Sequence, residues 1–547
     1  MKKIESIYNM KHTRVLLFSG MLLLFFSCTK KYAEYNTDPY KATLEQQVAD
    51  NYISGKNFPA MINAVTPAGD PPGKTDYVNS YQIAFNLGAD CFSGFMGQAG
   101  DWGGNTNSLT YGFNLAWVNE QFSLTGKLMA AWKNIKDITD ITKDSLQFSV
   151  AQIIKVTGII RATDSYGPIP YSAIPTGTFT PAYDSQDSIY YSAFNDLTTA
   201  RDILFKYGAV SGTPLREYDL IYEGDYLKWA KYANSMILRL AMRIVYVDPA
   251  NAKKYAEEAV SNPAGLLSTP SENALHGLKS GNGAFNYNNP LVTLTEGYEE
   301  TRAGASMQFI LSGYNDPRIN VFFSKATLTG HTSEVLGVRS GINITRSLYQ
   351  PFSRLNVANN TPLPWMQASE VNFLRAEGAI RGWNMGGTAK DFYEEGVKTA
   401  FAETGVGMPA NYLADGSSRP ADYVDFANSG NNVLNPNTDT VSIKWDDQAL
   451  FKVKLHRIMN QKWIALYPNG CEAWAEYRRT GYPRIFPVVL NKSGGTVNTN
   501  LQVRRPPYPI AQYNQNGAQV ARGVAKLGGP DNGGTQLWWD KNNTDRY

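Results

Sequence analysis

This 547-residue sequence has little of the residue types that build metal centres and disulfide frameworks. It holds three cysteines and four histidines, and they do not cluster at the spacings of a zinc site. Beyond residue 28 only Cys91 and Cys471 remain, too few and too far apart for a disulfide framework. We expect them to be two free, buried thiols, and the sequence indicates neither a metal ion nor a cofactor.

Recognisable catalytic motifs are also missing. There is no G-x-S-x-G nucleophile elbow, no H-E-x-x-H zinc motif and no phosphate-binding glycine loop in a strand–helix setting. Carboxylates are plentiful, but nothing singles out two of them as the pair that a glycosidase uses. The sequence therefore singles out no catalytic site, and a surface glycoside hydrolase or peptidase stays an open alternative.

Net charge is small and unevenly placed. The chain carries 51 basic and 48 acidic residues, a formal charge of +3. The N-terminal leader accounts for this excess, because it holds Lys2, Lys3, Lys11 and Arg14 against the single Glu5. The rest of the chain is formally neutral, which gives no reason to expect nucleic acid as a partner.

Long hydrophobic runs are absent as well. The longest, from Val15 to Ser27, is shorter than the roughly 20 residues that a membrane-spanning helix needs. A basic leader followed by such a core is typical of an export signal, whichever of Met1 or Met10 is the true start. We therefore expect residues 1–27 to be a signal peptide.

Cys28 ends this run directly after a small residue, where a lipoprotein signal is cut. Two or three acyl chains on one cysteine bury many methylenes and anchor a protein firmly. We expect Cys28 to be the lipidated first residue of the mature protein, with residues 28–44 as a polar tether. Ordinary secretion with an unmodified Cys28, or an uncleaved chain, is the alternative.

Helical periodicity dominates the rest, so we expect a mainly α-helical fold in a single domain, residues 45–547. Two regions are instead rich in Gly, Asn, Ser, Thr and Pro, an insert at about 262–366 and a tail at about 480–547. The pattern predicts helices over 45–63, 77–93, 115–142, 147–164, 188–206, 224–245, 251–261, 367–382, 388–404, 446–467 and 471–479.

Paired helices with short links suggest αα-hairpin repeats. Ala389, Tyr393 and Gly396 have the small–aromatic–small spacing of the second helix of a tetratricopeptide repeat. Phe373 occurs where the first helix of such a repeat carries an aromatic residue. We therefore expect tetratricopeptide-like helix pairs, although no strict period runs through the chain.

Aromatic residues are abundant, and residues 94–113 interleave them with Gly and Asn in a long irregular segment. Such segments inside a domain are usually functional. Trp102 and Tyr111 offer rings that stack on a sugar or peptide plane, and the amides of Asn105 and Asn107 offer hydrogen bonds. These four residues are the best site candidates, and the equally open alternative is that Trp102 only plugs the domain surface.

Several other conspicuous residues are expected to be structural. Arg239 and Arg243 lie on one face of an apolar helix, which favours buried ion pairs. The segment 314–319 (YNDPRI) is expected to form a turn, and 537–541 (LWWDK) to supply core-packing tryptophans. The acidic side chains expected on solvated helix faces are Asp137, Asp140, Asp144, Glu394 and Glu395.

Together, several segments resemble the SusD/RagB-like nutrient-binding outer-membrane lipoproteins, in the branch that ends in a tryptophan pair. The most specific segment is the helix GDYLKWAKYANSMILRLAMRI, which begins at Gly224. The others, in the usual order of the family, are FFSC, YNTDP, ATDSYGPIPYS, PAYDSQDSIY, NDPRI, EVNFLRAEGAIRGW, IALYPNGCEAWAEYRRTGYP and LWWDK.

The resemblance implies a helical scaffold that carries a loop-rich ligand region and performs no catalysis. It implies an oligosaccharide or peptide ligand and a SusC-like TonB-dependent transporter as partner, over which the lipoprotein sits as a lid. It also implies a lipid anchor in the outer membrane, facing the cell exterior, although Lys30 and Lys31 stand where acidic residues are common. A structural or adhesive lipoprotein is the second alternative.

Ligand-binding aromatics of starch-binding relatives come from two regions. One is the loop after the early helices, which here contains Trp102, Asn105 and Tyr111. The other is the loop-rich middle of the chain. By region alone, the resemblance therefore also implies Tyr287, Tyr314, Tyr349 and Trp365 as ligand contacts.

Overall fold

The computed structural model describes residues 51–71, 73–174, 180–277, 287–434 and 439–541. The chain separates into two units, Met1–Ile53 and Ser54–Tyr547, and the second unit contains nearly all of the helices and strands. The expected signal peptide, the lipidated Cys28 and the tether lie outside the described residues.

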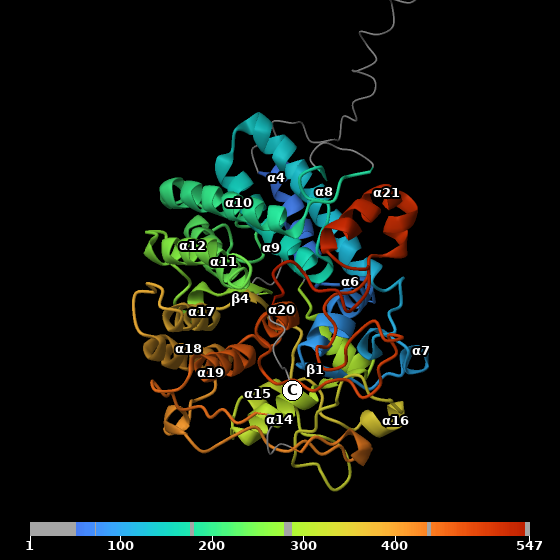
Figure 1. Cartoon of the computed structure of the whole chain (residues 1–547). Helices are drawn as coiled ribbons and strands as arrows, with labels where there is room; N and C mark the ends of the chain where they lie inside the picture. Colours follow the sequence, from blue (N-terminus) through green and yellow to red (C-terminus); the bar gives the residue numbers. More distant parts are fainter. Residues whose placement is uncertain (1–50, 72, 175–179, 278–286, 435–438, 542–547) are drawn as a thin grey trace, which may run out of the picture. The chain divides into compact units, whose positions relative to one another are not determined.

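The mainly helical fold predicted from the sequence is confirmed (Figure 1). The longer helices are α5 (Asn57–Val65), α6 (Asp76–Tyr81), α8 (Asn119–Thr142), α9 (Ser145–Tyr166), α10 (Gln186–Tyr207), α11 (Tyr226–Arg243), α12 (Pro249–Ser261), α14 (Ala305–Gly313), α17 (Ala368–Ile380), α18 (Ala389–Thr404), α19 (Phe451–Ala465), α20 (Gly470–Thr480) and α21 (Ile510–Leu527). The short helices are α4 (Tyr52–Gly55), α7 (Trp102–Asn105), α13 (Pro290–Val292), α15 (Ile319–Phe322) and α16 (Arg346–Tyr349). The π-helix η1 (Gln82–Asp90) continues α6.

Local sequence signals set several helix ends. The Asp144 carboxylate accepts a hydrogen bond from the Gln147 amide at 2.9 Å and caps the N-terminus of α9. The same helix ends at Tyr166, because Gly167 takes a φ of 83° and Pro168 cannot continue a helix. Asp144 is thus a cap in addition to being part of an acidic run.

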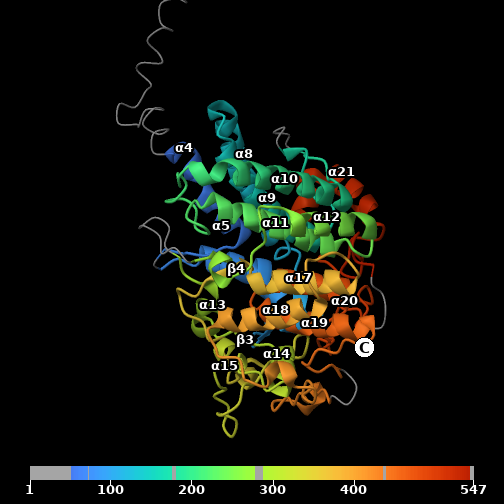
Figure 2. The ribbon, with the colours of Figure 1, turned by 90° about the vertical axis from the view of Figure 1, so that its left-hand side faces the viewer.

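The helices form two stacked groups (Figure 2). In one group α8, α9, α10, α11 and α12 pack against one another in sequence order, and α17, α18 and α19 form the other. Within the second group, Gly396 of α18 lies against the ring of Phe373 on α17, where an added Cβ would be 2.8 Å from the ring. This is the close helix contact that the tetratricopeptide-like pattern predicts.

Strands are few, and they tie distant loops together. β1 (Met96–Gln98) pairs antiparallel with β3 (Thr301–Ala303). β2 (Ala274–His276) pairs antiparallel with β4 (Leu363–Met366). The pair β1–β3 therefore joins the segment before Trp102 to the region of residues 262–366. The pair β2–β4 joins the two ends of that region to each other.

The two arginines of α11 make buried ion pairs, as predicted. Arg239 donates to both carboxylate oxygens of Glu370, at 2.7 and 2.6 Å. Arg243 donates to Glu472 and Glu476 of α20, each at 2.7 Å. Because buried charges need partners, these residues serve the core rather than a ligand.

The other two segments that were expected to be structural also have residues buried in the core. Within YNDPRI, Arg318 pairs with Asp316 at 2.6 Å, and both side chains are fully buried. Within LWWDK, Trp539 is fully buried and donates its indole N–H to Asp164 at 2.8 Å. Buried hydrogen bonds therefore anchor both segments in the interior.

The tail contains a helix that the sequence did not indicate. α21 holds Gly and Asn residues that weaken helical propensity, and its φ and ψ leave the helical range at Asn516. Packing compensates, because Val520 is fully buried and Gly523 lies against the ring of Tyr183. Tertiary contacts thus form a helix that local sequence disfavours.

None of the helices in the described part of the chain is long and apolar enough to span a membrane.

Candidate ligand-binding surface

Asn105 fixes the loop Trp102–Phe113 to the segment around residue 344. Its amide nitrogen donates to the Asn343 side chain at 2.9 Å and to the Ile344 carbonyl at 3.1 Å. Its amide oxygen accepts from the Ile344 backbone N–H at 3.0 Å. Because these groups are used internally and the residue is buried, Asn105 positions the loop instead of facing a ligand, contrary to the prediction.

Asn107 has a similar internal role. Its side-chain oxygen accepts from the Leu109 amide at 3.0 Å, which caps the 3-10 turn η2 (Ser108–Thr110). Its side-chain nitrogen donates to the Trp102 carbonyl at 3.1 Å. The predicted ligand amide is therefore a clamp that holds Trp102 in place.

Trp102 and Trp117 are two partly exposed tryptophans of this region. Their rings are 6.4 Å apart at 80°, an edge-to-face pair, and both residues are half-buried. The Trp102 ring also covers Gly100, where an added Cβ would be 2.6 Å from it. Trp117 was not predicted, although a second tryptophan so soon after the loop was a visible signal.

A small cleft of about 40 Å³ continues from Trp117. Phe113, Trp117 and Gln121 are its half-buried lining residues beside the loop, and Gln121 donates to the Arg161 carbonyl at 3.3 Å. We call Trp102, Phe113 and Trp117 the Trp102 surface. It offers fixed aromatic rings without the cost of ordering a loop on binding.

Lys492 supports this surface from the tail. Its ammonium group donates to the Gly104 carbonyl at 3.1 Å and to the Thr106 hydroxyl at 2.9 Å. Gly103 and Gly104 have φ values of 61° and 59°, which glycine adopts without strain. The loop is therefore held at its glycine turn by Lys492 and next to this turn by Asn105.

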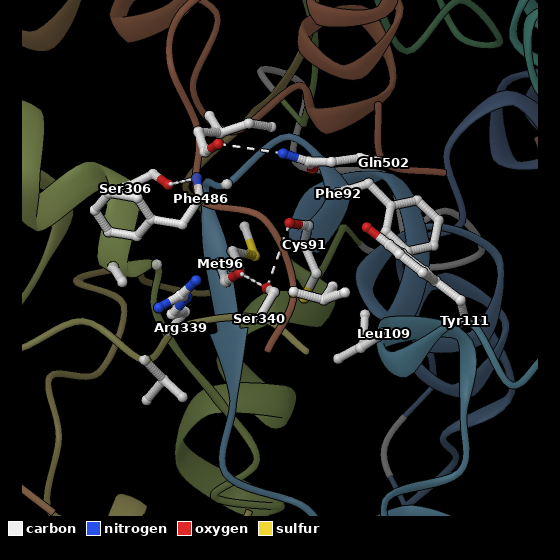
Figure 3. A pocket seen from close by; sticks show the side chains of 16 residues that line it. Cys91, Phe92, Met96, Leu109, Tyr111, Ser306, Arg339, Ser340, Phe486 and Gln502 are labelled. Carbon is white, nitrogen blue, oxygen red and sulfur yellow. Dashed lines mark hydrogen bonds between the residues drawn. The ribbon is translucent and has the colours of Figure 1, made fainter. Parts of the chain in front are cut away.

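Tyr111 is buried and is not part of this surface. It is 4% exposed and lines a small cavity together with Cys91, Met96 and Arg339 (Figure 3). The cavity measures about 20 Å³, room for a single water and not for a sugar. Burial raises the pKa of the Tyr111 hydroxyl. The prediction that Tyr111 stacks on a ligand is therefore wrong for this structure.

Three aromatics predicted by region are also core residues. Trp365 is fully buried, and its indole N–H donates to Thr66 at 3.0 Å. The hydroxyl of Tyr314 donates to the Val441 carbonyl, and that of Tyr349 to Asp425, each at 2.8 Å. Since these rings are 2% exposed or less, none of the three offers a face to a ligand.

Tyr287 is half-buried, and its hydroxyl donates to the Thr361 carbonyl at 2.8 Å. Its ring stands edge-to-face with His276 at 5.3 Å. A ligand role for Tyr287 stays a prediction, as does the one for Trp102.

Several groups away from the Trp102 surface have shifted pKa values. Both cysteines are free as expected, but only Cys91 is buried, whereas Cys471 is half-buried. Desolvation raises the pKa of each thiol to about 12, which disfavours the reactive thiolate. Burial lowers the pKa of His276 to about 3. Within the described ranges, no three His, Cys, Asp or Glu side chains gather in a way that suits a metal ion.

Solved structures of similar proteins extend over nearly the whole chain. A chitin-binding SusD homolog from Flavobacterium johnsoniae is 38% identical, with a TM-score of 0.83 over 90% of this chain and 100% of that one. A SusD homolog from Bacteroides uniformis is 35% identical, with a TM-score of 0.82 and the same coverage. A SusD-like protein from Bacteroides thetaiotaomicron is 33% identical, with a TM-score of 0.82 and the same coverage. No curated protein matches.

A family model described as "SusD-like: Susd and RagB outer membrane lipoprotein" matches residues 34–540. Members of this family are non-catalytic binding proteins, which confirms the prediction that the chain is not an enzyme. The expected outer-membrane location is confirmed in the same way. The chain therefore belongs to the SusD/RagB family of outer-membrane lipoproteins.

Proposed function

We propose that this protein captures oligosaccharides on the Trp102 surface and delivers them to a SusC-like TonB-dependent transporter. The observation that carries the proposal is the edge-to-face pair of Trp102 and Trp117, half-buried on a loop that Asn105 and Asn107 hold in place. The C–H faces of a sugar ring stack on such aromatics, and a fixed loop loses little entropy on binding.

A relative supports the choice of ligand class. The solved structure that is 38% identical is described as chitin-binding. Chitin fragments are uncharged, so they suit a surface made of uncharged aromatic rings. They are therefore the first ligands to test.

The direct test is calorimetry of the soluble body with triacetylchitotriose, maltotriose and a capped tripeptide. We expect one of the saccharides to bind and Trp102→Ala to weaken it roughly tenfold or more, as truncation of an aromatic hot spot does. Trp383→Ala is the matched control, because Trp383 is another half-buried tryptophan but follows α17. Equal loss in both variants, or binding of the peptide alone, would contradict the proposal.

The anchor and partner are tested in cells. Lipidation at Cys28 predicts that Cys28→Ala moves the folded protein out of the membrane fraction. A large TonB-dependent transporter is expected to co-purify with the wild-type protein after mild solubilisation. Recovery of the protein alone would favour the adhesive alternative, and release of shortened saccharides would favour a hydrolase. Protease accessibility on intact cells would then establish whether the protein faces the exterior.

A further inference from the structure

A groove of about 500 Å³ lies between α8 and α21, apart from the Trp102 surface. Figure 1 shows α21, in red, beside α8. Phe122, Ser123, Gly126 and Met129 line it from α8, and Gln512 and Asn516 line it from α21. Its volume is within the range of small-molecule sites, while the cavity beside Tyr111 measures about 20 Å³.

Asn516 fixes the wall that α21 forms in this groove. The residue is 6% exposed, and its amide nitrogen donates to the Pro181 carbonyl at 2.9 Å. Its side-chain oxygen has no hydrogen-bond partner among the described residues, but it also has almost no exposed surface, so a ligand in the groove cannot reach it. Asn516 therefore holds α21 in place, and other side chains offer the polar contacts.

The kink of α21 produces this arrangement. Asn516 has φ −141° and ψ 33°, outside the helical range, in the middle of an otherwise regular helix. The kinked residue reaches across to Pro181 instead of following the helix surface. A kink without proline at the kinked residue needs a specific cause, and the bond to Pro181 supplies one.

Gln512 offers a polar group to the groove. Its side-chain oxygen accepts from the Tyr183 hydroxyl at 3.0 Å. This leaves its amide nitrogen as a donor one helical turn before Asn516. The groove therefore offers this amide donor from α21 and the Ser123 hydroxyl from α8, and hydroxyl groups of a ligand suit both because each hydroxyl both donates and accepts.

The remaining lining is apolar or neutral. Phe122 and Met129 form an apolar wall, and Ser123 contributes a hydroxyl. No charged side chain is among the described residues that line the groove. A charged ligand would lose hydration here without gaining a counter-charge, so the groove selects for an uncharged ligand that combines apolar faces with hydroxyl groups.

From these features we infer that the α8–α21 groove is a second saccharide site, for neutral sugars, independent of the Trp102 surface. The two sites share the first turns of α8, since Gln121 lines the cleft beside Trp117 while Phe122 and Ser123 line the groove. A glycan of several units held at one site thereby raises the effective concentration of its other units at the second.

Gly126 gives a specific way to block the groove. It is exposed on α8, and a Cβ added there meets nothing within 4 Å. Gly126→Trp therefore fills the groove without disturbing the core. Lys127→Trp is the control, because it adds the same bulk to the next, exposed position of α8, which does not line the groove. Thermal unfolding of both variants checks that they fold.

Binding is measured in a Trp102→Ala background, so that the Trp102 surface contributes least. The probes are triacetylchitotriose and maltotriose, and their binding is measured by saturation-transfer NMR and calorimetry. We expect one of them to bind weakly, Gly126→Trp to reduce its affinity roughly tenfold or more, and Lys127→Trp to leave it within about twofold.

Three results would overturn the inference. They are equal affinity with and without Gly126→Trp, absence of binding of both trisaccharides in the Trp102→Ala background, and preferential binding of a capped tripeptide in the groove. Failure here leaves the proposed function standing, because that function is judged by the loss that Trp102→Ala causes in the otherwise wild-type chain.

Discussion

Arg479 on α20 donates two hydrogen bonds to Glu377 on α17, at 2.7 and 2.6 Å, and both side chains are fully buried. Arg479 also pairs with Glu476, and Glu377 with Arg381. The last helix of the scaffold before the tail is thereby joined to the tetratricopeptide-like pair. Burial alone would raise the pKa of Glu377, but the guanidinium groups of Arg479 and Arg381 lower it below its usual value.

Glu377→Gln is expected to destabilise the protein by about 3 kcal/mol, because it leaves a buried guanidinium without one of its counter-charges. The measurement is the free energy of unfolding in urea. The matched control is Glu394→Gln, which removes the exposed pair with Lys390 and is expected to cost at most about 0.5 kcal/mol. A similar loss in the free energy of unfolding of the two variants would show that the buried pair contributes no more to stability than the exposed one.

Two glycines in helices are expected to respond in opposite directions. Gly396→Ala places a Cβ 2.8 Å from the Phe373 ring and should cost about 1–3 kcal/mol through overpacking. Gly126→Ala meets open space and should stabilise α8 by about 0.5–1 kcal/mol. Urea unfolding measures both. Phe373→Leu should partly rescue Gly396→Ala, and absence of rescue would argue against this contact as the cause.

Substitutions of Asn105 can distinguish the effect of its side-chain hydrogen bonds on the loop from the effect of backbone strain at this position. Its φ is 62°, in the left-handed region that glycine adopts freely and alanine does not. Asn105→Gly removes the clamp alone, whereas Asn105→Ala also strains the backbone by about 1 kcal/mol. We expect faster hydrogen exchange over residues 101–113 and several-fold weaker saccharide binding in both variants. Unchanged exchange in Asn105→Gly would rule out the clamping role.

The sequence predicted helices better than it predicted surfaces. The end of α9 before Gly167 and Pro168 and the buried pairing of Arg239 and Arg243 follow from local rules and burial costs. The environment of Trp365 does not, because its partner Thr66 is 299 positions away in the sequence. A tryptophan in a loop-rich region has the same local pattern whether tertiary contacts cover it or leave it exposed.

The same reason explains the errors at the site. Asn105 and Asn107 lie in the candidate loop, but whether an amide faces a ligand or the protein depends on segments such as residues 343–344 that lie far along the chain. The α21 side of the groove was missed because local propensity disfavours this helix, which is kinked at Asn516.

Asp90 should make stability depend on pH. It is 1% exposed, and burial raises its pKa from 3.8 to about 7, although hydrogen bonds from Tyr81 and Asn86 oppose the rise. The folded protein therefore keeps this proton between about pH 4 and 7 while the unfolded chain loses it. A raised acid pKa gives stability that is fully present below the unfolded value and is lost as pH rises towards 7.

Asp90→Asn keeps the side-chain shape but removes this titration. Relative to wild type, we expect the variant to gain stability as pH rises from 5 to 7, by on the order of 1 kcal/mol per pH unit, and to change little beyond pH 8. Urea unfolding at each pH measures the difference between the two proteins, which cancels contributions such as that of Glu403, whose pKa burial also raises to about 7. Asp137→Asn, at an exposed ion pair, should show no such trend. A difference between Asp90→Asn and wild type that is constant with pH would mean that Asp90 is already ionised at pH 5 in the folded protein.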